Sequence, residues 1–216
     1  MQHSGTTHHD RSKKFKAPLH GGKGIPGYTY GTKEVARSPV SLKEFELLKN
    51  TILWTDEDEK YIRMSREVLE DQTDDILDVW YSFIKVEPQL AIYFSYKNDH
   101  RLNKDYMDAV RLRFKQWILD TADANYDQKW LNYQHEIALR HLTKKNQTDN
   151  VDSVEKIHFR YILALAYPLT ATLKPFLAKK HTHDAEDVEC MYQAWIKSVL
   201  LQVCLWSQPY VKEGDY

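Results

Sequence analysis

The stretch WLNYQHEIALRHLTKKNQ, residues 130–147, decides the fold of this chain, because it joins an apolar helical stripe to a single histidine. Trp130, Tyr133, Ile137 and His141 follow one another at intervals of three, four and four residues. Residues spaced in this way lie on one face of an α-helix. The pattern therefore predicts an amphipathic helix whose inner stripe ends in an imidazole.

Flanking residues predict where this helix begins and ends. Asn125, with Gln128 three residues later, favours an N-cap and a start near Tyr126. Lys144 and Lys145 suit the negative end of the helix dipole, and the polar run NQTDN that follows favours a stop. We expect a helix from about residue 126 to residue 145.

Two other features of the stretch concern charge and ligation. Glu136 and Arg140 are one turn apart and are predicted to pair on the outer face of the helix. His141, at the end of the apolar stripe, has two interpretations. It is either a core histidine bonded to a nearby carbonyl group or a ligand for a metal or cofactor.

Composition limits the class of protein. The 216 residues suffice for one well-buried core but are few for two domains. Apolar residues make up 42% and charged residues 28%, as in a soluble globular domain. The formal net charge of −1 gives no reason to expect a nucleic-acid partner. The aromatic residues (14 Tyr, 7 Phe and 6 Trp) either pack a core or line a flat apolar cofactor.

The cysteines and the apolar runs indicate the compartment. Cys190 and Cys204 fall in one predicted helix, where 14 residues separate them by about 21 Å, so they cannot pair within one copy. This favours a reducing compartment. No apolar run approaches 18 residues, and residues 1–24 contain no signal-peptide core. We expect a cytoplasmic protein without a membrane segment.

The rest of the chain predicts one all-α domain at 25–216, preceded by a flexible tail at 1–24. Ser41 with Glu44 forms a capping box, and Thr55 begins a helix with four acidic residues in its first turn. Asp152 and Glu155 predict a further cap. Helices are expected at 41–52, 55–69, 73–85, 88–94, 104–122, 126–145, from 152 to beyond 167 with a kink at Pro168, and 184–206.

Common catalytic motifs are missing from the sequence, but a different constellation remains. There is no G-x-G-x-x-G, P-loop, G-x-S-x-G, C-x-x-C or H-E-x-x-H. His141, Phe114, Trp80 and Tyr81 all point inward from predicted helices. A haem iron needs an imidazole ligand, apolar walls and a polar group on its opposite side. Tyr81 offers that hydroxyl; without a cofactor, Trp80 and Phe114 are simply core residues.

Several segments resemble protoglobins, which are single-domain relatives of the globin-coupled sensors. The similarity runs from about Ile25 to Tyr216 with almost no gaps and leaves residues 1–24 outside. The segments are IPGYTYG (25–31), DVWYSF (78–83), RLRFKQWILDT (111–121), YDQKWLNYQHEIALRH (126–141), TKKNQTDNV (143–151), PFLAKKH (175–181), MYQAWIK (191–197) and LWSQPYVKEGDY (205–216).

The resemblance implies an expanded globin fold, a 3-over-3 helical sandwich with an additional helix at 41–52 and an N-terminal loop. It implies a haem b cofactor, iron protoporphyrin IX, with His141 as the axial iron ligand. Trp80 and Tyr81 would lie on the distal side with the gas ligand. Phe114 would lie over the distal haem face.

The resemblance also implies contacts at the haem edge and one departure in the distal pocket. Arg113 is the candidate to approach a haem propionate, and Tyr28 and Tyr30 of the N-terminal loop help to bury the propionates. Leu165 stands where family members carry phenylalanine, so the distal space or a tunnel should be larger. Leu142 stands where a second histidine often follows the axial one, which leaves a single candidate ligand.

Three functions are compared. The first is a haem protein that reversibly binds O2, CO or NO for gas sensing, storage or scavenging, without an attached output domain. The second is a haem enzyme that converts reactive nitrogen or oxygen species, for example by NO dioxygenation or peroxynitrite isomerisation. The third is a haem-free helical interaction protein. Apolar residues around much of the last two helices, such as Trp195 and Trp206, also predict a homodimer through these helices.

Overall fold

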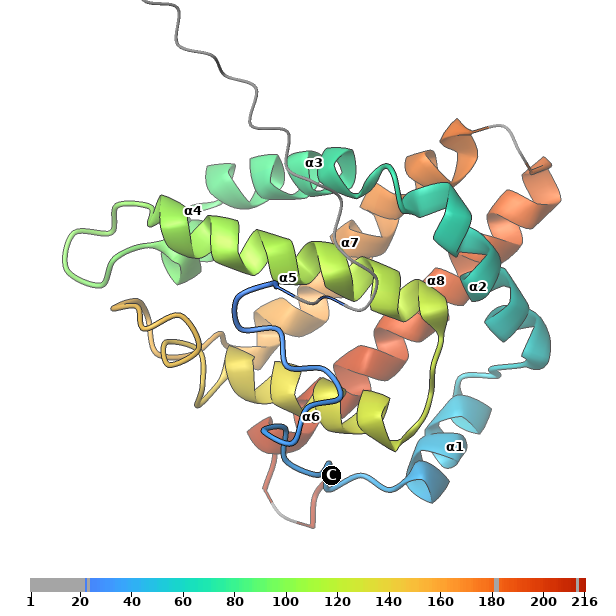
Figure 1. The fold of residues 1–216 in the computed structure, drawn as a ribbon, viewed down its shortest axis with the longest axis horizontal. Helices are drawn as coiled ribbons and strands as arrows, with labels where there is room; N and C mark the ends of the chain where they lie inside the picture. The colour runs from blue at the N-terminus through green and yellow to red at the C-terminus, as the bar shows by residue number, and fades with distance from the viewer. Residues whose placement is uncertain (1–21, 23, 181–182, 213) are drawn as a thin grey trace, which may run out of the picture.

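The computed structural model describes residues 22, 24–180, 183–212 and 214–216, and the described part is helical (Figure 1). Extended pairing among these residues is limited to one antiparallel bridge between Ser95 and Leu102. The expected tail, residues 1–24, lies almost wholly outside the described residues. The helices are α1 (Leu42–Thr51), α2 (Asp56–Leu69), α3 (Thr73–Val86), α4 (Pro88–Ala91), η1 (Ile92–Phe94), α5 (Lys104–Asp123), α6 (Gln128–His141), α7 (Phe159–Lys179), α8 (Ala185–Ser207) and η2 (Gln208–Tyr210).

The predicted capping box of α1 and the predicted starts of α2 and α8 are confirmed, and each of the three helices has a side-chain cap. The Ser41 side chain accepts a hydrogen bond from the backbone N–H of Glu44, whose carboxylate accepts one from the Ser41 backbone. Thr55 and Asp58 form the same reciprocal pair at α2. Asp184 accepts from two backbone N–H groups at the start of α8. These local signals fix where the helices begin.

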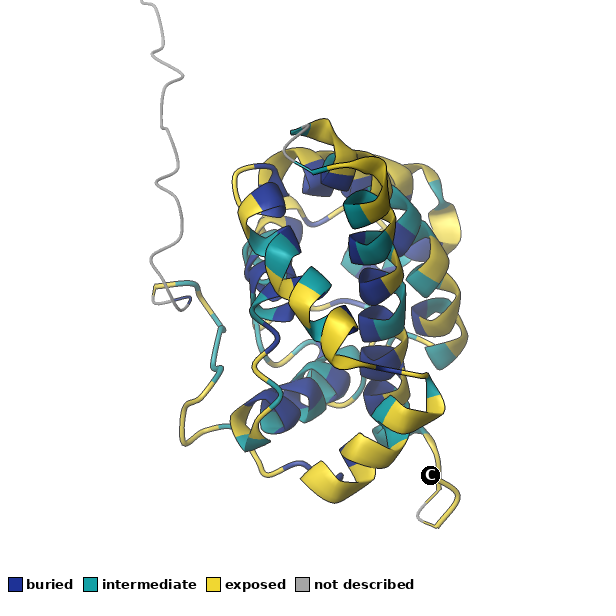
Figure 2. Ribbon diagram, turned by 90° about the vertical axis from the view of Figure 1, so that its right-hand side faces the viewer, coloured by how far each residue is buried: buried dark blue, intermediate teal, exposed yellow. Residues whose placement is uncertain are grey.

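The helices form two layers around a buried centre. In Figure 1, α5 and α6 lie in front of α7 and α8, and α2 closes one side against α5 and α8. Figure 2 shows the buried residues of the helices turned toward the interior and the exposed ones turned outward. Trp195 of α8 is fully buried at the centre and donates a 2.8 Å hydrogen bond to Ser65 of α2. The expected all-α class is confirmed for the described residues.

Helix α6 is shorter at both ends than the sequence predicts. Asp127 caps it instead of Asn125, by accepting a 2.8 Å hydrogen bond from the backbone three residues later. The helix ends at His141, and residues 142–150 form consecutive turns. Lys145 therefore lies outside the helix and folds inward, with 2% of its surface exposed. The helix therefore ends about four residues before the end that Lys144 and Lys145 predicted.

The predicted helix start near Asp152 is wrong. The carbonyl of Asp152 accepts a hydrogen bond from the backbone of Lys97, and the Glu155 carboxylate pairs with the Lys97 ammonium at 3.2 Å. Helix α7 begins only at Phe159, after His158. Asp152 and Glu155 have the spacing of a cap, but they join this loop to the turn before α5.

Helix α7 differs from the expectation that no segment is long and apolar enough to cross a membrane. Among the described residues, α7 is the one helix whose length and apolar composition would suffice to cross a membrane, and 33% of its qualifying 18-residue stretch is buried. It continues through Pro168, and its buried side includes Leu173 and Leu177. It packs against α8, α2 and α3. One side of α7 therefore belongs to the core, and the opposite side is apolar and exposed.

The pair formed by Glu136 and Arg140 is present, but it is not on the outside. Glu136 is 6% exposed and binds Arg140 at 3.1 Å and Lys144 at 2.7 Å. Arg140 also donates a 2.9 Å hydrogen bond to the Thr29 hydroxyl. Residues 24–40, here called the N-terminal strap, cross over α5 and α6 (Figure 1), and Thr29 of the strap contacts Arg140.

Candidate functional site

The main cavity lies between the two helical layers. It encloses about 1360 Å³ of space between side chains, a figure that includes its opening to solvent. Its walls come from α3, α5, α6, α7 and α8 and are largely aromatic and aliphatic. The lining includes Trp80, Tyr81, Phe114, Trp117, Tyr133, Ile137, His141, Tyr161, Leu165, Val199, Val203 and Trp206. A large, flat, apolar ligand fits such walls.

His141 lines this cavity from the last position of α6. Its Nδ1 is buried and finds no hydrogen-bond partner among the described residues. Burial lowers the pKa of the imidazole to about 4, although the carbonyl of Ile137, one turn earlier, opposes the shift. The ring is therefore neutral at physiological pH, which is the form that binds a metal. When one ring nitrogen binds a metal, the other commonly donates to a carbonyl, and Ile137 is placed for that contact.

The end of α6 is held firmly behind this ring. The carbonyl of His141 accepts hydrogen bonds from the backbone of Ile157 at 2.8 Å and from the Tyr210 hydroxyl at 3.0 Å. The Trp206 ring lies 5.5 Å from the imidazole, centroid to centroid, and its Nε1 is fixed by a 2.9 Å bond to Gln134. Segments far apart in the sequence thus position a single imidazole.

A lone imidazole restricts which metal the cavity suits. In the described part of the chain, no three histidine, cysteine, aspartate or glutamate side chains gather to hold a metal ion. His141 alone cannot provide a protein-only coordination sphere. The site therefore suits a metal that brings its other ligands with it, as iron in a porphyrin does.

Tyr81 of α3 also lines the cavity and offers a hydroxyl. It is 3% exposed, and its buried hydroxyl has no hydrogen-bond partner within the described chain. Burial raises the pKa of the phenol, so it stays protonated and keeps its donor. An unpartnered buried hydroxyl is costly unless a ligand completes it. Tyr81 therefore has the property expected of a donor to a bound ligand.

Trp80, Phe114 and Leu165 contribute apolar surface to the same cavity, as predicted. The rings of Trp80 and Phe114 meet edge to face at 5.8 Å, and Phe114 meets Trp117 at 5.4 Å. Leu165 reaches the cavity from α7. Leu142, the residue after α6, stands at the position of a possible second histidine. Of the histidines in residues 126–142, only His141 lines the cavity.

Arg113 lines the cavity, but it is already committed to other groups. Its guanidinium binds Asp149 through two hydrogen bonds of 2.9 and 2.6 Å. It also donates a 2.9 Å hydrogen bond to the carbonyl of Pro26 in the N-terminal strap. Arg113 therefore ties α5 to both the strap and the turns after α6.

The N-terminal strap approaches this point closely because it carries a glycine. Gly27 has a positive φ of 73°, and a Cβ there would lie 2.9 Å from Arg113 Nη1 and 3.0 Å from Thr148 Cγ2. Any larger residue would require the strap or the Arg113 side chain to shift. Arg113, Thr148 and Asp149 all line the cavity, so the strap closes over one end of it.

Tyr28 and Tyr30 lie one layer outside the cavity. Both rings pack edge to face on Tyr133, at 5.3 and 5.2 Å, and Tyr133 lines the cavity. The Tyr28 hydroxyl donates a 2.7 Å hydrogen bond to Asp120, whose pKa burial raises to about 6. The two tyrosines thus cover the cavity wall, while their predicted role at the propionates stays a prediction.

Sequence analysis missed three residues of the site. Lys145 lines the cavity but was assigned to a helix end; its spacing of four from His141 is the signal that could have found it. Tyr210 and Trp206 contact His141 from the C-terminal segment. No local pattern predicts these contacts, because they join residues more than 60 positions apart in the chain.

The fold is that of a globin domain. The chain superimposes on the globin domain of the Geobacter sulfurreducens globin-coupled sensor with a TM-score of 0.58, at 14% identity, covering 77% of this chain and 97% of that one. At this identity the likeness concerns the fold alone. No curated protein sequence matches the chain significantly.

The sequence family is established separately. The protoglobin family model matches residues 41–216, so the chain belongs to the protoglobin family. Membership in this globin family implies a haem cofactor. The residues present fit that group: a neutral imidazole at His141, an unpartnered hydroxyl at Tyr81 and apolar surface between them. The chain is therefore a globin-type haem protein.

Proposed function

We propose that this protein binds haem b through His141 and reversibly binds a diatomic gas, O2, CO or NO, in the part of the cavity lined by Tyr81. The observation that carries the proposal is the presence of two groups in the walls of one apolar cavity: the neutral imidazole of His141 and the buried, unpartnered hydroxyl of Tyr81. Haem, when bound, supplies an iron atom that coordinates such gases reversibly.

The chain's own residues have three tasks in this function. His141 supplies the imidazole that holds the iron, and its anchored backbone keeps the ring in place. Trp80, Phe114 and Leu165 exclude water from the gas side of the cavity. Tyr81 donates a hydrogen bond, which favours a polar gas such as O2 over CO.

The enzymatic alternative has less support. General acid–base chemistry needs a titratable group that is free to move a proton near the iron. Within the described residues, Asp149 is the carboxylate that lines the cavity, and Arg113 holds both of its oxygens. Tyr81 remains protonated because burial raises its pKa. Asp149 and Tyr81 therefore suit binding better than turnover.

Absorbance spectroscopy tests the proposal. Purified protein, supplied with hemin, should show a Soret band at one haem per chain and shift reversibly with CO and with O2 after reduction. Stoichiometric gas binding without steady-state consumption of NO, peroxynitrite or peroxide is the expected result. A protein that takes up no haem contradicts the proposal, and sustained consumption favours the enzymatic alternative.

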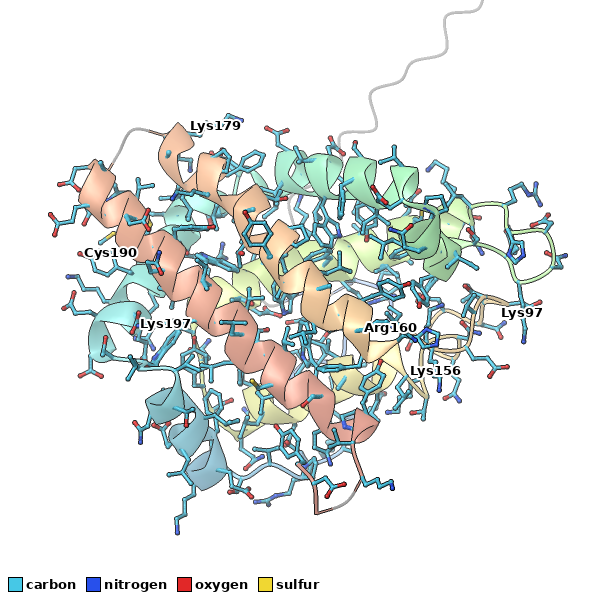
Figure 3. All side chains as sticks on the ribbon, turned by 180° about the vertical axis from the view of Figure 1, so that it is seen from behind. Lys97, Lys156, Arg160, Lys179, Cys190 and Lys197 are labelled. Carbon is cyan, nitrogen blue, oxygen red and sulfur yellow. The ribbon has the colours of Figure 1, made fainter. Side chains whose placement is uncertain are left out.

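We also propose that the protein forms a homodimer through α7 and α8. These helices lie side by side on the face seen in Figure 3, where Arg160 and Lys179 mark the ends of α7, and Cys190 and Lys197 lie along α8. Trp195 and Trp206, the residues from which the sequence predicted this interface, are buried in the core, so that part of the prediction is wrong. The large apolar residues exposed on the two helices are Leu163 (52% exposed), Tyr167 (76%) and Leu200 (39%).

Exposed apolar groups on two adjacent helices favour association over solvation. Light scattering should therefore give twice the monomer mass. Tyr167→Glu, at the most exposed of these positions, should shift the mass toward the monomer, whereas Val86→Glu on α3, similarly exposed at 72%, should leave it unchanged. A monomeric wild type would contradict this proposal.

A further inference from the structure

Lys145 is a buried cation in the wall of the main cavity. Its residue surface is 2% exposed, and the cavity contacts it directly. Its ammonium makes two hydrogen bonds, both to neutral oxygens: 3.2 Å to the Ser153 hydroxyl and 3.4 Å to the Asn146 side chain. The Tyr106 ring lies 5.2 Å from the ammonium. These contacts are too weak to replace the hydration of an ammonium group.

The other two cations that line the cavity have carboxylate partners. Arg113 binds Asp149 at 2.6 Å, and Arg140 binds Glu136 at 3.1 Å. Lys145 has no carboxylate within ion-pair distance among the described residues. Asp149 acts on it from farther away and opposes the effect of burial, which lowers the pKa of Lys145 to about 8. Lys145 is therefore the cavity cation whose charge is left uncompensated.

A buried charge without a partner is strongly destabilising. A buried lysine of this kind therefore indicates a ligand that supplies the missing opposite charge. The ligand must bring an anionic oxygen to the ammonium while its apolar body fills the cavity. A porphyrin with ionised carboxylate side chains has this combination. Lys145 follows His141 by four residues, in the turns after α6, and both residues line the cavity.

We propose that Lys145 pairs with a carboxylate of the bound porphyrin, and that Arg113 instead serves to tie the N-terminal strap to Asp149. This inference rests on the proposed function, because it requires haem in the cavity. It assigns the predicted propionate contact to a different residue. Ser153 and Asn146 then orient the ammonium and share its hydrogen bonds with the ligand carboxylate.

The test compares iron protoporphyrin IX with its dimethyl ester, in which both carboxylates are masked. Wild type and Lys145→Gln are loaded with either compound, and transfer to an excess of a scavenging apoprotein is followed by absorbance. Charge-assisted hydrogen bonds predict that Lys145→Gln speeds the loss of haem by roughly 10- to 100-fold. The loss of the ester should not change, because the ester offers no charge to Lys145.

Matched controls separate this contact from general effects. Lys144→Gln removes a neighbouring lysine that pairs with Glu136 at 2.7 Å and should leave both rates unchanged. Arg113→Gln loosens the strap and should speed the loss of haem and ester by the same factor. Lys145→Arg keeps the charge and should retain haem.

Each outcome decides the inference. A Lys145→Gln variant that releases both compounds equally fast, or neither faster than wild type, overturns it. Should that variant not fold, the wild type alone decides: equal rates of loss for haem and ester overturn the pairing, and a roughly tenfold faster loss of the ester supports it. Binding of haem through His141 without any ester effect would leave the proposed function intact. Failure to bind haem at all overturns both.

Discussion

Two walls of the cavity are built in different ways: the wall around His141 at the end of α6 (the His141 wall) and the wall around Tyr81 of α3 (the Tyr81 wall). Behind His141, the Ile157 backbone and the Tyr210 hydroxyl both bond the same carbonyl, and Trp206 packs on the ring. Tyr81 is placed by apolar packing, with the Phe94 ring 5.8 Å away. A wall anchored at its backbone suits a permanent coordination bond. A wall that only positions a hydroxyl suits a ligand that binds reversibly.

The largest expected effect follows from removing the anchored imidazole. His141→Ala should abolish tight haem binding, because the described residues that line the cavity include no other histidine. Haem titration followed at the Soret band measures this, and added imidazole should restore binding. His135→Ala is the control, since His135 lies on the same helix but does not line the cavity. An equal loss of haem binding in both variants would contradict the assignment of His141 as the iron ligand.

A smaller effect is expected from the Tyr81 wall. Tyr81→Phe should leave haem binding unchanged but speed O2 dissociation by roughly 10- to 100-fold, because one hydrogen bond to a polarised ligand is lost. Flash photolysis or stopped-flow mixing measures the rate. Tyr133→Phe removes a hydroxyl from the His141 side of the cavity and should not change it. An unchanged rate in Tyr81→Phe would mean that its hydroxyl does not touch the gas.

The anchor behind His141 can be weakened without touching the ring. Tyr210→Phe removes the hydroxyl bonded to the His141 and Ile157 carbonyls and should lower the free energy of unfolding by about 1 kcal/mol. This corresponds to a fall in Tm of about 2–4 °C in thermal unfolding. Tyr216→Phe removes an exposed hydroxyl bonded to the Cys204 carbonyl and should change the Tm less. A larger loss in the Tyr216 variant would contradict the anchoring role.

The smallest effect concerns the strap. Gly27→Ala and Gly31→Ala both place alanine at a positive φ, so the backbone strain is similar. Only at residue 27 does the new Cβ collide with Arg113 and Thr148; at residue 31 its nearest neighbour is 4.0 Å away. Gly27→Ala should therefore release haem a few-fold faster than Gly31→Ala in a haem-transfer assay. Equal rates would mean that the strap does not protect the cavity.

Features set by neighbouring residues could be predicted from the sequence. The Ser41–Glu44 box begins a helix because both partners lie within one turn. The inner stripe ending at His141 was also correct, since helical spacing alone places it on one face. The family resemblance then supplied the globin class, which neither composition nor spacing could define.

Features set by distant residues could not be predicted. Asp152 and Glu155 have the spacing of a cap, but contacts with Lys97 hold them in a loop. Glu136 is buried because the strap, more than 100 residues away in the sequence, covers Arg140. Lys145 faces the cavity because α6 ends early. Each error arose where tertiary contacts outweighed a local signal.

The structure of the haem-loaded protein, determined by crystallography, tests the central claim most directly. The account predicts iron bonded to the imidazole of His141, with the Tyr81 hydroxyl on the opposite face of the porphyrin. Iron bonded to a different side chain, or a porphyrin bound outside the cavity, would contradict it.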